Sequence, residues 1–233
     1  MPNVMVALDL KNHHWERDAP LLIYKLKHAG CTHYKVHGKL SPMDLGATAK
    51  HLRTAVLPGK SAVVMIDIKK HDIESQIIEA VEEHVMMGFD LVTVHASVGK
   101  TILSEVVKEY GEHVVAVTVL TGMKDEDVFA VYGKTRAEKE VDFGKIAFDS
   151  GVTKGVVSSA PGIPAIQEYV KGVPFMAPGI RPEGYVSNDQ VAIATPAQAR
   201  AFGASVLIVG RPVIESKYPE QVFAEISRQS AAP

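Results

Sequence analysis

The chain has 233 residues, of which 46% are hydrophobic, and this is enough for one domain with a substantial core. Charged residues make up 22% and the formal net charge is -2, so the composition predicts neither a polyanion-binding surface nor a nucleic-acid partner. The single cysteine, Cys31, excludes an intramolecular disulfide, and the sequence has neither a signal-peptide pattern nor an apolar run of about 18 residues, so we expect a cytoplasmic protein without a membrane span.

Short apolar runs alternate with helical patterns along the whole chain. Gly30 and Gly88 are typical helix C-caps, and Ser41 before Pro42 is a typical helix start. Strands are predicted at residues 4–8, 32–36, 62–66, 91–94, 114–120, 155–157, 174–176 and 206–209. Helices are predicted at residues 18–29, 42–56, 73–87, 100–110, 125–131, 136–148, 164–170, 196–202 and 220–228.

This alternation predicts an α/β fold. Several strands are continuously apolar and the connections are short, which is typical of a parallel sheet covered on both faces. Eight such units favour a single closed (β/α)8 TIM barrel, with residues 1–233 forming one catalytic domain. The long irregular stretch at residues 178–193 is a candidate lid.

Polar residues recur where the predicted strands end. In parallel barrels the carboxyl ends of the strands carry the active site, so we expect these residues to surround one pocket. They are Asp9, Lys35, Asp67, Lys69, His95, Thr121, Ser159, Arg181 and Arg211.

The third strand ends in the most concentrated group of charges, Asp-x-Lys-x-x-Asp. Asp67 and Lys69 lie two residues apart, so on an extended strand they point to the same side, and Asp72 follows where a helix begins. With Lys35 one strand away, alternating charges would keep one another ionised and hold the Lys69 ammonium ready as a proton donor. A purely structural salt-bridge network is the alternative.

The ends of the last two strands suggest a phosphate site. Residues 178–181 read Pro-Gly-Ile-Arg, and Gly210 precedes Arg211. Glycine lets backbone N–H groups approach phosphate oxygens, arginine offers a bidentate fork, and the loops after strands seven and eight commonly bind phosphate. A glycine turn beside a surface arginine is the alternative for either pair taken alone.

The remaining candidates are weaker. His37, His71 and His95 could line the pocket or pack with hydrogen bonds in the core, and the histidines show no metal-ligand pattern. Cys31 is expected to be a small buried hydrophobic residue.

At this point the sequence resembles the orotidine 5'-monophosphate decarboxylase family. The family signature Asp-x-Lys-x-x-Asp-Ile corresponds to residues 67–73. The other matching segments, in the family's order, are residues 6–9 (Val-Ala-Leu-Asp), 34–36 (Tyr-Lys-Val), 94–97 (Val-His-Ala-Ser), 117–121 (Val-Thr-Val-Leu-Thr), 155–160 (Gly-Val-Val-Ser-Ser-Ala), 178–182 (Pro-Gly-Ile-Arg-Pro), 188–190 (Asn-Asp-Gln) and 208–212 (Ile-Val-Gly-Arg-Pro).

The resemblance implies decarboxylation of orotidine 5'-monophosphate to uridine 5'-monophosphate (UMP) without metal or other cofactor. Lys69 would protonate C6 of the pyrimidine, Asp67 would lie beside the substrate carboxylate, and Asp72 would reach the ribose of a partner subunit in a homodimer. Together with Lys35 these are the implied catalytic residues. The implied substrate-binding residues are Asp9, Ile73, Gln76, Thr121, Ser159, Pro178, Arg181, Gln190, Gly210 and Arg211.

Asp9 and Lys35 would contact the ribose, and Thr121 and Ser159 would lie beside the base. The residues that would hold the phosphate are Arg181, Gln190, Gly210 and Arg211. The sequence departs from the family at two places. Glu74-Ser75-Gln76 replaces the usual Pro-Asn-Thr, so Gln76 must take over the threonine contact or that contact is lost, and His37 precedes the glycine that usually follows Lys-Val.

Two other functions remain open. One is a magnesium-dependent sugar-phosphate decarboxylase or aldolase of the same superfamily, although such enzymes typically continue the motif with Ala-Gly, where this chain has Ile73-Glu74. The other is a catalytically silent barrel that binds a nucleotide phosphate, against which the intact set of charges argues.

Overall fold

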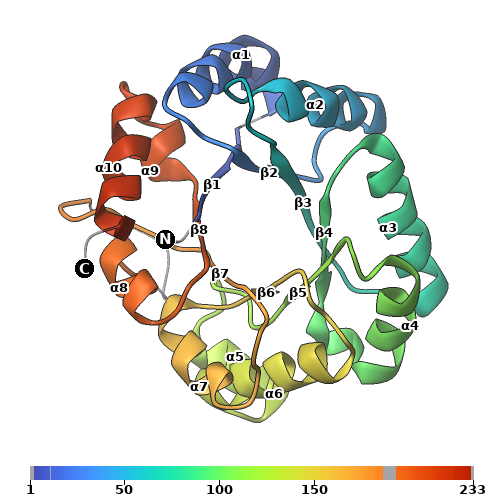
Figure 1. Ribbon diagram of the computed structural model, residues 1–233. Helices are drawn as coiled ribbons and strands as arrows, with labels where there is room; N and C mark the ends of the chain where they lie inside the picture. Colours follow the sequence, from blue (N-terminus) through green and yellow to red (C-terminus); the bar gives the residue numbers. More distant parts are fainter. Residues whose placement is uncertain (1–2, 11, 186–192, 232–233) are drawn as a thin grey trace.

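The computed structural model describes residues 3–10, 12–185 and 193–231, and within them the strands close into a barrel. The eight strands pair in chain order, all in parallel, and β8 pairs with β1 (Figure 1). Their bounds are β1 Asn3–Ala7, β2 His33–His37, β3 Val63–Lys70, β4 Leu91–His95, β5 Val114–Val117, β6 Val156–Val157, β7 Phe175–Ala177 and β8 Val206–Val209. The predicted single (β/α)8 barrel is therefore confirmed.

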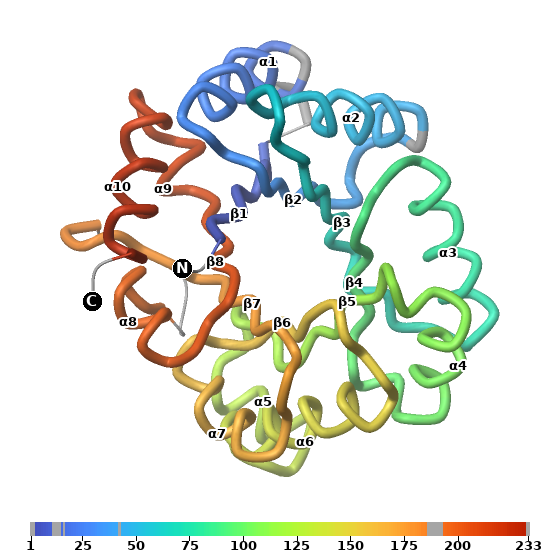
Figure 2. The backbone as a smooth tube through the Cα atoms, in the orientation of Figure 1, coloured from blue at the N-terminus to red at the C-terminus, as the bar shows by residue number. Residues whose placement is uncertain are grey.

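The helices form an outer ring around the strands (Figure 2). Their bounds are α1 Asn12–His28, α2 Pro42–Thr54, α3 Glu74–Met87, α4 Lys100–Tyr110, α5 Asp125–Tyr132, α6 Arg136–Asp149, α7 Ile163–Gln167, α8 Pro196–Ala201, α9 Arg211–Ile214 and α10 Pro219–Ala231. Two short 3-10 turns, η1 Ala96–Val98 and η2 Ala160–Gly162, follow β4 and β6. No helix in the described ranges is both long enough and apolar enough to cross a membrane.

The caps of the helices follow from local sequence. The Ser41 side chain accepts a hydrogen bond from the Asp44 amide with Pro42 in the first turn, as predicted. Gly88 adopts a left-handed conformation after α3, which is the usual way for a glycine to end a helix. Thr135 and Glu138 form a capping box at the start of α6.

Alternation along β1 divides the core into two layers. Val4 and Val6 point outward into the large cluster between strands and helices, whereas Met5 and Ala7 point into the barrel. The smaller interior cluster also contains Met65, Leu91, Val115, Met176, Val206 and Ile208. Ala7, Met65 and Ile208 of this cluster also line the pocket described below, so the barrel core forms its floor.

The structure differs from the predicted elements in three places that matter for the site. β3 continues to Lys70 instead of ending at residue 66, and β5 stops at Val117, so residues 118–120 belong to the following loop. The short helix α9, which begins at Arg211, was not predicted, because four residues give no helical periodicity.

Candidate active site

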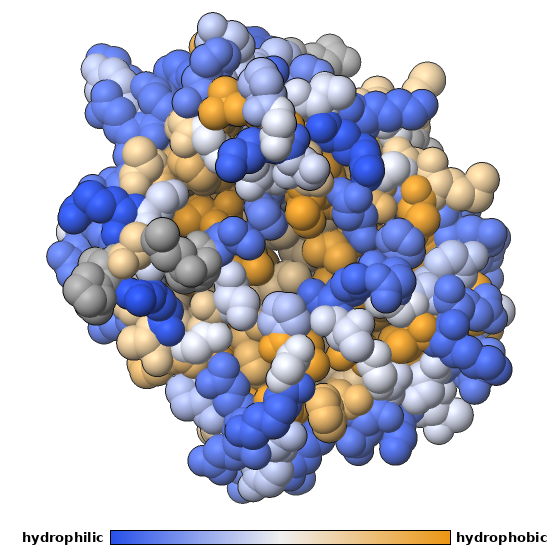
Figure 3. Space-filling view, viewed as in Figure 1, coloured by the Kyte–Doolittle hydropathy of each residue, from blue (hydrophilic) through white to orange (hydrophobic). Residues whose placement is uncertain are grey.

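A cavity of about 670 Å³ opens at the carboxyl ends of the strands. The face shown in Figure 3 is hollowed over the barrel axis, with hydrophobic residues inside and hydrophilic ones around them. Predicted residues from β2, β3, the start of α9 and the loops after β1, β5, β7 and β8 line the cavity. They are Asp9, Lys35, Asp67, Lys69, Thr121, Pro178, Arg181, Gly210 and Arg211.

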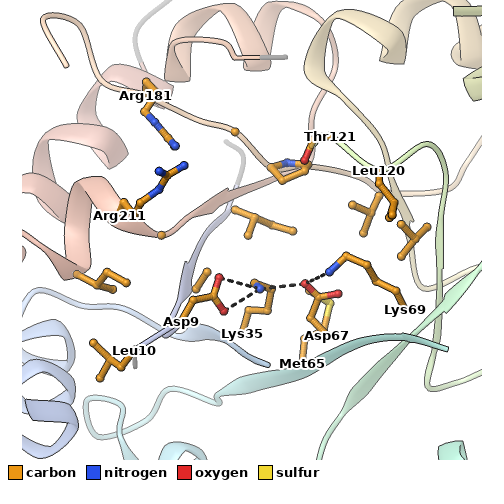
Figure 4. A pocket seen from close by; sticks show the side chains of 18 of the residues that line it. Asp9, Leu10, Lys35, Met65, Asp67, Lys69, Leu120, Thr121, Arg181 and Arg211 are labelled. Carbon is orange, nitrogen blue, oxygen red and sulfur yellow. Dashed lines mark hydrogen bonds and ion pairs between the residues drawn. The ribbon is translucent and has the colours of Figure 1, made fainter. Parts of the chain in front are cut away.

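Four of these side chains form a continuous row of alternating charge (Figure 4). The Lys35 ammonium donates to Asp9 Oδ1 at 3.0 Å and to Asp67 Oδ2 at 2.9 Å. The Lys69 ammonium donates to the same Asp67 oxygen at 2.8 Å. Asp67 therefore stands between two cations, and Lys35 stands between two carboxylates.

The row keeps its inner groups ionised although they are buried. Burial favours the neutral carboxyl of Asp67, but the ammonium groups of Lys35 and Lys69 outweigh it and lower the pKa of Asp67 to about 2. Burial likewise disfavours the Lys35 ammonium, but Asp67 and Asp9 raise the pKa of Lys35 above its ordinary value. The side chain of Lys69 is 41% exposed, so its ammonium faces the cavity at the open end of the row.

An irregularity in β3 presents Lys69 to the cavity. The register against β4 shifts between Ile66 and Lys70, and Lys69 has a positive φ of 47°. A lysine rarely adopts this conformation, and such backbone outliers concentrate at functional sites. The fully buried Thr93 stabilises the irregularity, because its hydroxyl accepts from the Lys69 amide at 2.8 Å and donates to Asp67 Oδ1 at 3.1 Å.

Sequence reasoning missed Thr93. It lies within the predicted fourth strand, where a threonine is an ordinary strand residue. One feature of the sequence could have indicated it: Thr93 is the only residue with a hydroxyl in the otherwise apolar run at residues 91–94. This run forms the strand beside the one that carries Asp67.

Arginine side chains from two loops converge on another part of the cavity. Arg181 follows β7 and is 6% exposed, and Arg211 opens α9 directly after Gly210. Figure 4 shows their guanidinium groups pointing toward one another, on the side of the pocket where Asp9 lies. Gly179 turns the chain after β7 at a φ of 78°, a conformation that glycine adopts without strain.

The ends of the long loop between β7 and α8 are held together. Ile180 bridges Ala194, with the Arg181 amide donating to the Ala194 carbonyl at 2.9 Å. Gln190 of this loop was predicted to bind phosphate. It belongs to residues 186–192, which lie outside the described residues.

Three predicted residues at the start of α3 do not line the cavity of their own chain. Asp72 accepts from Lys70 at 3.0 Å, Ile73 is 64% exposed, and the Gln76 amide donates to Glu79 at 3.1 Å. All three are exposed, in the segment between the end of β3 and the first turn of α3.

Ser159 is likewise turned away from the cavity lining. It is 2% exposed, and its hydroxyl donates to Glu140 at 3.0 Å and accepts from the Gly162 amide at 3.2 Å. The neighbouring Val157 at the end of β6 does line the cavity.

The candidate residues His37, His71 and His95 do not line the cavity. His95 is 6% exposed, contacts the edge of Phe143 and accepts from the Ser97 amide at 3.2 Å. Burial, followed by the nearby His71 and Lys69, lowers the pKa of His95 to about 4. His37 is within hydrogen-bond distance of the Leu10 carbonyl, at 3.2 Å, and Cys31 is fully buried as expected.

The cavity also has lining residues that the sequence did not single out. Leu120 and Val119 come from the loop after β5, and Glu215 follows the unpredicted helix α9. Their positions depend on where β5 ends and α9 begins, which the sequence pattern did not resolve.

These features define a class of protein: a (β/α)8 barrel with an ionised lysine–aspartate row and an arginine pair at the carboxyl ends of its strands. Comparison with known proteins narrows the class. The family model for the orotidine 5'-phosphate decarboxylase / HUMPS family matches residues 2–226, and the chain belongs to this family.

Curated relatives named orotidine 5'-phosphate decarboxylase agree with this assignment. The protein of Sulfurimonas denitrificans is 34% identical over 172 residues, covering 71% of this chain and 75% of the relative. That of Campylobacter jejuni strain RM1221 is 32% identical over 169 residues, covering 70% of this chain, and the match spans 60% of the relative's length.

Solved structures show the same fold. The orotidine 5'-phosphate decarboxylase from Lactobacillus acidophilus superposes with a TM-score of 0.78 at 24% identity, covering 100% of both chains. The orotidine 5'-monophosphate decarboxylase from Methanocaldococcus jannaschii, complexed with inhibitor BMP, gives a TM-score of 0.76 at 18% identity, again over 100% of both chains.

Proposed function

We propose that this protein decarboxylates orotidine 5'-monophosphate to UMP and carbon dioxide, in the cytoplasm, as a step of de novo pyrimidine biosynthesis. The observation that carries the proposal is the row Asp9–Lys35–Asp67–Lys69 at the base of a cavity that also contains Arg181 and Arg211. Family membership over residues 2–226 supports the same conclusion.

The proposed chemistry assigns the proton transfer to Lys69. The bond between C6 and the carboxylate carbon breaks, and its electron pair stays on C6. A proton from the Lys69 ammonium then forms the new C6–H bond, and the resulting amine regains a proton from water. Because the ring offers this carbanion little delocalisation, a fixed ammonium beside C6 supplies the main stabilisation of the transition state.

Asp67 has two proposed roles. Its carboxylate holds the Lys69 ammonium in place at 2.8 Å, and it would face the substrate carboxylate across a short distance. Two like charges in a pocket of low dielectric constant repel each other, and this repulsion is relieved when carbon dioxide leaves. Its lowered pKa supports a charged Asp67 throughout the neutral pH range.

The remaining contacts are assigned by position. Asp9 and Lys35 would bind the ribose, Thr121 would lie beside the base, and Arg181 and Arg211 would hold the phosphate together with Pro178, Gly210 and Gln190. Phosphate binding far from the broken bond can contribute to catalysis by fixing the substrate in the reactive position.

A metal-dependent reaction at the same carboxylates is less well supported. Lys35 occupies the position between Asp9 and Asp67 that a bridging cation would need, and its side chain is 9% exposed. Among residues 3–10, 12–185 and 193–231, no group of three or more His, Cys, Asp or Glu side chains could hold a metal ion. The Lys35 ammonium between Asp9 and Asp67 therefore argues against a metal ion that bridges these two carboxylates.

We further propose a homodimer in which Asp72 completes the partner's site. The side chain of Asp72 is 42% exposed at the start of α3, and it is followed by the exposed apolar Ile73. An exposed apolar residue beside a charged residue that does not line the cavity of its own chain is what a shared interface requires. Ile73 and Gln76 would reach the neighbouring site from the same turn.

The direct test follows the loss of orotidine 5'-monophosphate absorbance with the purified protein. We expect turnover to UMP at a rate that is unchanged by an excess of EDTA. Absence of turnover would leave the silent phosphate-binding barrel as the better description. Turnover that EDTA abolishes and magnesium restores would favour the metal-dependent alternative.

A further inference from the structure

The wall of the cavity formed by the ends of β5 and β6 has little support from the sheet itself. β6 consists of Val156 and Val157, and β5 is joined to it through two residue pairs. Leu120, Thr121 and Val157 nevertheless line the cavity here. Because short ladders restrain adjoining loops weakly, these residues need support from another element.

Helix α6 provides that support for the loop after β5 through Arg136. The Arg136 guanidinium donates to Asp125 at 2.8 Å, to the Leu120 carbonyl at 3.4 Å and to the Met123 carbonyl. The arginine thereby contacts both ends of the turn that contains Thr121. Its side chain is 13% exposed, so these contacts are partly shielded from water.

One turn further along α6, Glu140 supports the loop after β6. Glu140 is 1% exposed, and its Oε2 accepts the Ser159 hydroxyl at 3.0 Å. Burial raises the pKa of Glu140. The hydrogen bond from Ser159 and the charge of Arg136 act in the opposite direction but do not outweigh it. Burying a polar or charged side chain here costs desolvation free energy that an apolar residue would not cost. The hydrogen bond to its oxygen therefore indicates a specific role for Glu140.

The fit around Glu140 is tight. A Cβ placed on Gly162 would lie 1.8 Å from Glu140 Oε2, so the carboxylate occupies space that only a glycine leaves open. Residues 136 and 140 are one helical turn apart and face the same side of α6. One helix face therefore fixes both loops.

We propose that Arg136 and Glu140 are positioning residues for recognition of the base. They touch no substrate themselves. By fixing the loop that carries Thr121 and the loop that follows Val157, they shape the wall that we expect to meet the pyrimidine ring, whereas Arg181 and Arg211 of the expected phosphate site belong to the loop after β7 and to the start of α9. In Figure 4 Leu120 lies near Lys69, and Arg181 and Arg211 lie on the other side of the pocket. This inference rests on the proposed function.

The test compares two ligands that share the sugar phosphate and differ in the base. Calorimetry would measure binding of UMP and of ribose 5-phosphate to the wild-type protein, Arg136→Met and Glu140→Leu. We expect each variant to bind UMP about three- to tenfold more weakly, as for one or two lost hydrogen bonds, and ribose 5-phosphate within about twofold of wild type.

Conservative variants and a control make the result specific. Glu140→Gln keeps an oxygen that accepts from Ser159, so it should recover most of the UMP affinity that Glu140→Leu loses. Arg228→Met removes a similar arginine–carboxylate pair on α10, where Arg228 donates to Glu225, and should change neither affinity. If Arg136→Met does not fold, Arg136→Lys provides the test, because it keeps the charge but not the three-way contact.

Three results would overturn the inference: equal weakening of both ligands, no change in UMP affinity, or a wild-type protein that binds UMP no better than ribose 5-phosphate. The turnover assay is separate. A wild-type protein that shows base-dependent binding without decarboxylation would contradict the proposed function and leave the positioning role of α6 standing.

Discussion

Lys69 combines a rare backbone conformation with the outermost charge of the row Asp9–Lys35–Asp67–Lys69. Its positive φ turns the side chain toward Asp67 and the cavity, and Thr93 binds the backbone that would otherwise relax. Strain of this kind costs about 1–3 kcal/mol at one residue and persists only where neighbouring contacts stabilise it. Two hydrogen bonds of Thr93, one from the Lys69 amide and one to Asp67, together with the Lys69–Asp67 ion pair therefore fix the ammonium before a substrate arrives.

Replacing Lys69 with alanine should separate binding from chemistry. We expect Lys69→Ala to lower kcat by at least about 10²–10⁴-fold, because the proton donor is lost, and to leave UMP affinity within about threefold. Steady-state kinetics and calorimetry would measure the two effects. Lys108→Ala on α4, which removes an exposed lysine paired with Glu105, is the control and should match wild type. Near-normal turnover by Lys69→Ala would contradict the mechanism.

His95 should make the stability of the fold depend on pH. Its pKa of about 4 in the folded protein lies below the ordinary value of 6.5, so between these pH values the unfolded chain binds a proton at His95 and the folded chain does not. The contribution of neutral His95 to the free energy of unfolding is complete above about pH 6.5 and declines as the pH falls toward 4. Between pH 7.5 and 5 we expect a loss of about 1–2 kcal/mol from this residue.

Urea unfolding at the two pH values would measure that loss. His95→Asn keeps a side chain that can cap the turn after β4 but cannot titrate. The variant should lose less stability between pH 7.5 and 5 than the wild-type protein does. An identical pH dependence in both proteins would exclude His95 as its source.

At the scale of secondary structure, the units of this barrel are unequal. β3 has eight residues and carries two charges of the row, whereas β6 has two residues and is followed by Ser159, which is hydrogen-bonded to Glu140 of α6. The long strand carries the groups that we propose to be reactive, and the short strands border the loops that are expected to contact the base. This division is consistent with the general use of loops for specificity on a rigid barrel.

The packing of η2 against α6 can be tested through Gly162. Gly162→Ala should destabilise the fold by about 2 kcal/mol, because the new methyl group collides with the Glu140 carboxylate although the backbone accepts alanine at a φ of -78°. In a Glu140→Ala background the same change should cost almost nothing. A double-mutant cycle of urea unfolding energies measures the coupling, and additive effects would show that the two side chains do not compete for space.

At the scale of the whole molecule, the proposed homodimer would complete each site with a residue of the other chain. Asp72 and Ile73 face away from the cavity that Asp67 and Lys69 line, although all four belong to one short motif. A motif that points in two directions is explained if the second half serves another subunit. The arrangement would make activity depend on association.

Mixed dimers test this dependence. Lys69→Ala and Asp72→Asn should each be nearly inactive alone. After their subunits are exchanged, half of the dimers are mixed and each mixed dimer has one intact site, so activity should return to about a quarter of wild type. Mixing Lys69→Ala with the double variant should restore nothing. No recovery in the first mixture would contradict a site shared between subunits.

The sequence alone determined the alternation of strands and helices, and with it the barrel and the end of the barrel where the site lies. It did so because apolar runs and helix caps are local signals, and because the carboxyl ends of parallel strands necessarily meet. It also singled out Asp67 and Lys69 by their spacing and Lys35 by its place near the end of a neighbouring strand. Only the tertiary structure decided how they act together, since Lys35 reaches both Asp9 and Asp67 across neighbouring strands.

The tertiary structure also revealed the supporting contacts of Thr93 and Glu140, which local sequence patterns do not indicate. The support from Thr93 depends on a register shift between two strands, and the contact of Glu140 with Ser159 joins residues nineteen positions apart through the space left at Gly162. A threonine in a strand and a glutamate in a helix are ordinary residues when read along the chain. Their roles arise from burial and proximity, which folding creates and which no spacing within a single element encodes.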